Sequence, residues 1–215
     1  MGDFLFKDGQ TVVFVGDSIT DCGRRGPDAL YGNGYVKLAV DLITAKYPER
    51  RITFLNEGIG GNTVEDLRNR WHDDVLRHRP DWVSVMVGIN DLHRVLRGDP
   101  AGVPPEKYRR LYRECLELTK EKTGANLILL DPFYISTDTD TGSFRSRVLS
   151  FISEYIAVVW ELAEEFGAVH VRTHEKFQEL LRYFPPDRFC PESVHPNMSG
   201  HMVIAYSLLE KLDWR

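Results

Sequence analysis

The chain has 215 residues, of which 42% are hydrophobic and 27% are charged, and its formal net charge is -5. A chain of this length can bury a large core without disulfides or metals, so we expect a single domain over residues 1–215. An acidic protein has no electrostatic attraction for a phosphate backbone, which excludes nucleic acid as a partner.

The chain lacks the apolar segments that direct a protein to or through a membrane. Its first ten residues contain no basic region followed by an apolar one, and no stretch of about 18 apolar residues occurs anywhere. The chain has three widely spaced cysteines, Cys22, Cys115 and Cys190. An odd number at such spacing is typical of reduced thiols rather than of a disulfide framework. We therefore expect a cytoplasmic protein without membrane association.

Short β-branched apolar runs alternate with longer amphipathic stretches along the whole chain. In chain order we predict strand 11–15, helix 34–47, strand 52–55, helix 64–77, strand 82–87, helix 105–122, strand 127–130, helix 143–166, strand 168–171 and helices 173–181 and 198–211. This alternation predicts a three-layer α/β/α fold with a five-stranded parallel sheet. The longest irregular segments are 22–33 and 183–197.

Ser18 follows the first predicted strand, at the sheet edge where parallel α/β folds place their sites. A serine hydroxyl is a poor nucleophile at neutral pH, so it needs a base within hydrogen-bond reach and a third group that orients the base. His195 is the candidate base, and Glu192, three residues earlier, is the candidate acid. Taken alone, each of these residues also fits a helix cap or an exposed polar position.

Gly61 and Asn90 follow the second and third predicted strands. Acyl transfer needs hydrogen-bond donors for the oxyanion of its tetrahedral intermediate, and a glycine-turn N–H or an asparagine amide can donate without titrating. Gly61, Asn90 and the main-chain N–H of Ser18 are therefore the candidate oxyanion hole. The alternatives are a turn with positive φ at the glycines and a helix cap at the asparagine.

Five further residues are candidates for a supporting or substrate-pocket role, although for the tryptophan helix packing is favoured over a pocket wall: Asp17, Asn62, Trp71, Asp91 and Val194.

Metal and nucleotide sites are the main alternative uses of these motifs. The Glu-x-x-His spacing of Glu192 and His195 also occurs in di-iron proteins, but that architecture needs paired copies on helices, and this chain has one copy. Residues 58–62 lack the third glycine of a dinucleotide-binding motif, and no Walker lysine follows. We expect no metal and no organic cofactor.

Four blocks in this order resemble those of the SGNH, or GDSL, hydrolase superfamily: Gly16-Asp17-Ser18, Gly61-Asn62, Gly88-x-Asn90-Asp91 and Val194-His195-Pro196. The resemblance implies a flavodoxin-like fold, with Ser18 as nucleophile, His195 as base and Ser18, Gly61 and Asn90 as the oxyanion hole. It also implies that no metal or cofactor is used.

The fourth block departs from the family, which usually has aspartate where this chain has Glu192. Glutamate is longer than aspartate by one methylene, so its carboxylate fits against the imidazole of His195 only if the loop that carries it lies further from the ring. A Ser–His–Glu triad is favoured over a dyad in which a main-chain carbonyl orients His195. Asp187 is a less favoured substitute because it lies further upstream.

Segments 16–24, 32–36, 70–71, 81–84, 132–135 and 200–202 are similar to the intracellular GDSL acetylxylan esterases of bacteria. This resemblance implies a serine esterase that removes acetyl groups from xylo-oligosaccharides or related carbohydrates through an acyl-enzyme. The expected partner is thus a small ester or an acetylated oligosaccharide, and a homo-oligomer is allowed. The alternatives are a lysophospholipase or thioesterase, a non-catalytic carbohydrate-binding or assembly subunit, and a flavodoxin-like nucleotide-binding module.

Overall fold

Five strands, all paired in parallel, form the sheet of the computed structural model, in the order β2-β1-β3-β4-β5. The structure describes residues 3–26 and 30–214, so residues 27–29 of the predicted irregular segment lie outside it. The strands are β1 (Thr11–Gly16), β2 (Thr53–Gly58), β3 (Trp82–Met86), β4 (Asn126–Leu130) and β5 (Val169–Val171).

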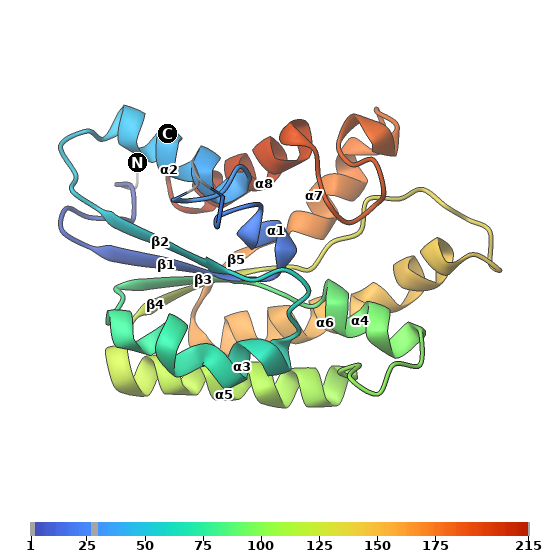
Figure 1. Ribbon diagram of the computed structural model, residues 1–215. Helices are drawn as coiled ribbons and strands as arrows, with labels where there is room; N and C mark the ends of the chain where they lie inside the picture. Colours follow the sequence, from blue (N-terminus) through green and yellow to red (C-terminus); the bar gives the residue numbers. More distant parts are fainter. Residues whose placement is uncertain (1–2, 27–29, 215) are drawn as a thin grey trace.

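Helices cover both faces of this sheet (Figure 1). One layer contains α1 (Ser18–Asp21), α2 (Tyr35–Lys46), α7 (Thr173–Leu180) and α8 (Met198–Lys211). The other contains α3 (Val64–Asp74), α4 (Ile89–Leu96), α5 (Pro105–Thr123) and α6 (Phe144–Phe166). Two 3₁₀ turns are η1 (Leu76–His78) and η2 (Pro186–Arg188). The predicted α/β/α fold with a five-stranded parallel sheet is confirmed.

The strands in the middle of the sheet are buried on both faces, which explains their nearly continuous apolar sequence. At the edge, β2 alternates between buried and more exposed residues, and it continues through Asn56, Glu57 and Gly58, beyond the predicted strand. The Asn56 side chain is nevertheless satisfied, because its amide donates to the Thr20 carbonyl at 2.7 Å and its oxygen accepts from Gly58 N–H at 2.9 Å.

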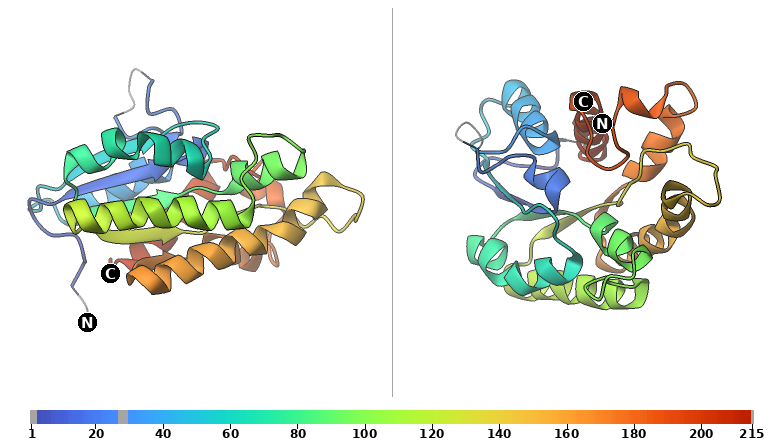
Figure 2. Two further views of the ribbon diagram at one scale, coloured as in Figure 1. Left: turned by 90° about the horizontal axis from the view of Figure 1, so that it is seen from below. Right: turned by 45° about the vertical axis from the view of Figure 1, so that its right-hand side comes forward.

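Two short helices, α1 and α4, were not predicted from the sequence. The first has four residues, which is too short to give an apolar periodicity, and the second has eight. Both begin directly after a strand, at the same edge of the sheet (Figure 1). The right-hand view of Figure 2 brings this edge forward and shows that segments from distant parts of the chain surround it.

Candidate active site

The candidate nucleophile, Ser18, is presented by the tight connection between β1 and α1. Ser18 is the first residue of α1, and the buried Asp17 caps that helix by accepting from Ile19 N–H at 3.0 Å. A Cβ atom at Gly16 would lie 2.3 Å from the Met86 carbonyl oxygen, so only glycine lets the chain turn this close to β3. The serine is left half-buried and open to the surface.

His195 and Glu192 form a hydrogen-bonded chain with Ser18. The Oγ atom of Ser18 lies 2.8 Å from Nε2 of His195, and Oε1 of Glu192 contacts Nδ1 of the same ring. The side chains of His195 and Glu192 are 55% and 54% exposed, so the site opens directly to solvent. A Nδ1–H donated to the carboxylate leaves Nε2 free to accept the serine proton.

The backbone of the turn between these two residues explains how the longer acid fits. Ser193 has φ 85°, in the left-handed region, which turns the chain back on itself. Its carbonyl accepts from Ile135 N–H at 2.9 Å, and the Cys190 thiol donates to the His195 carbonyl at 3.1 Å. Asp187 lies in η2, and its main-chain carbonyl accepts from Asn197. Glu192 is therefore the carboxylate that contacts the base.

The three candidate oxyanion donors follow neighbouring strands, because β1 lies between β2 and β3. Gly61 is exposed and has φ +79°, a conformation that favours glycine. One N–H of the Asn90 amide donates to the Asn62 carbonyl at 3.0 Å, which fixes the orientation of the amide. Its second N–H is available to an oxyanion.

Helix α4 holds the loop that contains Gly61. Besides the Asn90 contact, Arg94 donates to the Gly61 carbonyl at 2.9 Å, and Asp91 accepts from Val64 N–H at 3.0 Å. Asp21 binds the other side of the loop by accepting from Gly60 N–H at 3.1 Å. The loop is thus fixed from both α1 and α4.

Two buried carboxyl groups, Asp17 and Asp91, lie behind the site. Burial raises the pKa of Asp17 to about 6, an effect that the nearby His195 opposes. Burial raises the pKa of Asp91 to about 8, and the charge of Asp17 adds to this effect. At neutral pH Asp91 is therefore mostly protonated, and its contribution is structural.

The remaining candidates differ in their placement. Asn62 lies in the loop of residues 59–63, here called the oxyanion loop, which also contains Gly61, and its side chain accepts from Arg70 at 2.8 Å. Val194 is buried within the turn that carries His195. The substrate-pocket role considered for Trp71 is wrong. Its side chain is 1% exposed and its indole N–H donates to Thr119 in α5 at 2.9 Å, so it packs between helices.

Sequence reasoning missed an aromatic wall formed by His93, Tyr134 and Phe144. The His93 ring lies 5.7 Å from that of Tyr134 and 5.2 Å from that of Phe144, measured between centroids. Tyr134 also hydrogen-bonds Ser193 in the acid–base turn. Burial lowers the pKa of His93 to about 4, so this ring is neutral. The available signal was spacing, since His93 lies almost one helical turn after Asn90.

Within residues 3–26 and 30–214, no three His, Cys, Asp or Glu side chains group as a metal site. In the same part of the chain, no helix is long and apolar enough to cross a membrane.

Comparison with known proteins gives matches along nearly the whole chain. Residues 14–203 match the GDSL-like Lipase/Acylhydrolase family. An acetylxylan esterase from Geobacillus stearothermophilus is 37% identical over 96% of this chain and 95% of its own. The lipoprotein YqeF from Bacillus subtilis (strain 168) is 37% identical over 56% of this chain and 47% of its own.

The crystal structure of Axe2, an acetylxylan esterase from Geobacillus stearothermophilus, has a TM-score of 0.89 and 36% identity, covering 98% of this chain and 97% of that one. Similar structures include those of three catalytic mutants of Axe2, in which a serine, an aspartate or a histidine is replaced by alanine. That aspartate lies three positions before the histidine, the separation of Glu192 and His195 here.

Proposed function

Because the chain belongs to the GDSL-like Lipase/Acylhydrolase family, we propose that it is a serine esterase that releases acetate from acetylated xylo-oligosaccharides or related carbohydrates. The observation that carries this proposal is the 2.8 Å contact between Ser18 Oγ and His195 Nε2, with Glu192 behind the imidazole. The full-length similarity to an acetylxylan esterase supports the choice of the acetyl group and of the sugar.

In the first step, Ser18 Oγ attacks the acetyl carbonyl carbon while Nε2 of His195 takes the hydroxyl proton. The carbonyl oxygen becomes an oxyanion, which accepts hydrogen bonds from the Ser18 and Gly61 N–H groups and the Asn90 amide. When the bond to the sugar oxygen breaks, His195 gives its proton to that oxygen. The products are the free sugar hydroxyl and an acetyl ester on Ser18.

In the second step, His195 takes a proton from water, and the resulting hydroxide attacks the acetyl ester on Ser18. The same donors stabilise the second oxyanion, because its oxygen is that of the original carbonyl. Breakdown returns the proton from His195 to Ser18 Oγ and releases acetate. Glu192 stabilises the imidazolium in both steps without taking up a proton itself.

The exposure of the catalytic side chains supports a bulky substrate. About half of each of the His195 and Glu192 side chains is accessible, so an ester on a long sugar chain can approach without entering a deep cavity. A lysophospholipase or thioesterase needs apolar contacts along its acyl chain instead. The two functions therefore differ in how rate depends on acyl length.

The deciding experiment compares acetylated xylo-oligosaccharides with p-nitrophenyl esters of increasing acyl length, with Ser18→Ala as control. We expect acetyl esters to give the highest kcat/KM and Ser18→Ala to be inactive and resistant to a serine-directed fluorophosphonate. A maximum at long acyl chains supports the lysophospholipase or thioesterase alternative. A parent protein that neither hydrolyses esters nor takes up the label is a binding or assembly subunit.

The cytoplasmic location remains a proposal, supported by the free thiols of Cys22, Cys115 and Cys190. The similarity to a lipoprotein over about half its length is the opposing observation. Fractionation of the producing cells, with the esterase activity as marker, distinguishes the two locations. Size-exclusion chromatography with light scattering tests for a homo-oligomer.

A further inference from the structure

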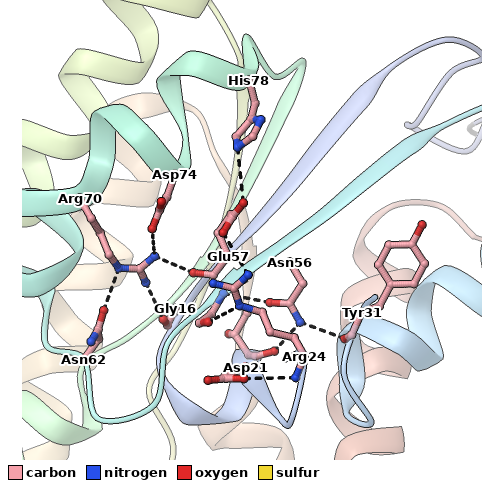
Figure 3. Close-up of polar contacts among 12 residues, drawn as sticks. Gly16, Asp21, Arg24, Tyr31, Asn56, Glu57, Asn62, Arg70, Asp74 and His78 are labelled. Atoms are coloured by element: carbon pink, nitrogen blue, oxygen red, sulfur yellow. Dashed lines mark hydrogen bonds and ion pairs between the residues drawn. The ribbon is translucent and has the colours of Figure 1, made fainter. Parts of the chain in front are cut away.

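Arg70 joins four segments of the chain around the oxyanion loop (Figure 3). Its side chain is 15% exposed, and its Nη2 donates to the Gly16 carbonyl at 3.0 Å. Its Nη1 donates to the Glu57 carbonyl at 2.7 Å and also binds Asp74, while Nε donates to Asn62 Oδ1 at 2.8 Å. One guanidinium thus connects the ends of β1 and β2 with the loop that follows β2.

These contacts place Arg70 beside the residues that carry the three oxyanion donors. Gly16 ends β1, two residues before Ser18. Asn62 follows Gly61 directly, and its main-chain carbonyl accepts from the Asn90 amide at 3.0 Å. A shift of the Asn62 side chain would therefore be transmitted both to the Gly61 turn and to the orientation of Asn90.

We propose that Arg70 is a positioning residue that holds the Ser18, Gly61 and Asn90 donors at the spacing that the oxyanion needs. This inference rests on the proposed function, because it assumes that these groups act on an acyl intermediate. Arg70 acts through Gly16 and Asn62 and does not contact the substrate. Donors of this kind stabilise a transition state only when they are held in place before the reaction.

The planar shape of the guanidinium is essential to this role. Arginine has five N–H groups in a rigid fork, and four of them are used here by acceptors in different directions. Lysine has the same charge but three donors on a single nitrogen, so it cannot bind the Gly16, Glu57 and Asn62 oxygens together. Arg70→Lys therefore removes the geometry while it keeps the charge.

The test compares Arg70→Lys with Arg113→Lys, a matched control in α5 whose arginine also binds a carboxylate, that of Glu165, at 2.7 Å. We expect Arg70→Lys to lower kcat for p-nitrophenyl acetate about 10- to 100-fold, the cost of a small misplacement of catalytic groups. KM should stay within about twofold, because the donors act mainly in the transition state. Arg113→Lys should match the parent.

A boronic acid inhibitor gives a second measurement, since its tetrahedral adduct with Ser18 mimics the intermediate. Its inhibition constant should rise in Arg70→Lys by the same factor by which kcat/KM falls. A residue that only stabilises the fold would lower the melting temperature and leave both quantities unchanged. All rates are therefore measured well below the melting temperature of each variant.

Asn62→Ala keeps the inference testable if Arg70→Lys fails to fold, because it removes one contact and leaves the charged network intact. It should reduce kcat in the same way, and the double variant should be no slower than Arg70→Lys alone. The inference is overturned if folded Arg70→Lys keeps the parental kcat and inhibitor affinity, or if Asn62→Ala keeps the parental kcat. In either case an inactive Ser18→Ala leaves the proposed function standing. An active Ser18→Ala instead overturns the proposed function.

Discussion

The candidate acid is Glu192, at the separation from the histidine where Axe2 has an aspartate. Glu192 reaches Nδ1 of His195 because Ser193 turns the backbone through φ 85°. The sequence does not reveal this turn, since a left-handed residue is usually glycine or asparagine. The contact between Ser18 and His195 could be expected from their motifs, whereas the contact of Glu192 with the ring lies in a turn that the sequence does not mark.

Replacement of Glu192 tests whether this contact orients the base. We expect Glu192→Ala to lower kcat about 10²- to 10⁴-fold, because His195 loses the group that fixes its tautomer and stabilises its protonated form. Glu192→Asp should keep most of the activity, since it retains the carboxylate. The measurement is kcat on p-nitrophenyl acetate beside the melting temperature. A folded Glu192→Ala enzyme with the parental kcat indicates a Ser–His dyad.

Asn90 is expected to contribute as a hydrogen-bond donor to the oxyanion. Asn90→Ala removes that donor and also the contact with the Asn62 carbonyl, so kcat should fall about 10²- to 10³-fold while the protein stays folded. Circular dichroism and single-turnover rates separate the two effects. Unchanged turnover in a folded variant removes Asn90 from the oxyanion hole.

At the scale of elements, the contact between α4 and the start of α3 determines the shape of the oxyanion loop. Asp91 binds Val64 N–H at 3.0 Å, and Arg94 binds the Gly61 carbonyl at 2.9 Å. The sequence placed Asn90 and Asp91 after β3 but did not reveal the helix that carries them. The parallel sheet could be predicted because apolar runs alternate with amphipathic stretches, whereas the eight-residue α4 was not predicted.

Asp91 should make the stability of this contact depend on pH. Its pKa in the folded protein is about 8, against an ordinary value of 3.8, so folding favours the protonated acid. The stability from this group is complete below about pH 4 and is lost as the pH rises toward 8. Asp91→Asn cannot ionise, so the free energy of unfolding of the variant relative to the parent should increase between pH 4 and pH 8.

Urea denaturation of both proteins across this range measures the difference, and other titrating groups cancel because they are common to both. At pH 4 the variant should be no more stable than the parent. If the free energies of unfolding of the two proteins change with pH in parallel, the pKa of Asp91 does not differ between the folded and unfolded states.

At the scale of the whole molecule, α6 packs on the sheet without carrying any of the predicted catalytic or oxyanion-hole residues. Tyr155 in α6 is 1% exposed, and its hydroxyl donates to the Val103 carbonyl at 2.8 Å. Tyr155→Phe leaves that buried carbonyl without its donor, which should cost about 1–3 kcal/mol of unfolding free energy. Its kcat should remain within about twofold of the parent. A large loss of kcat would show that this contact of α6 affects the site.

Trp71 shows what motif spacing does not determine. The sequence favoured helix packing for this residue but left a pocket role open, because adjacent residues on a helix point in different directions and the sequence does not show which one faces the site. Arg70 turns toward the strand ends and Trp71 toward α5. Motif spacing predicts which segments lie close together. The direction in which each side chain points is known only once the packing of its helix is known.

The contact between Ser18 and His195 joins residues 177 positions apart. A chain made in the N- to C-terminal direction therefore carries Ser18 long before it receives His195. Since β1 is also enclosed only when the later strands β2 and β3 lie on its two sides, a chain that ends before His195 has no competent esterase site. Hydrolytic activity should thus appear only after His195 has been made and the strands between the two residues have paired, which makes it a sensitive reporter of the folding of this domain.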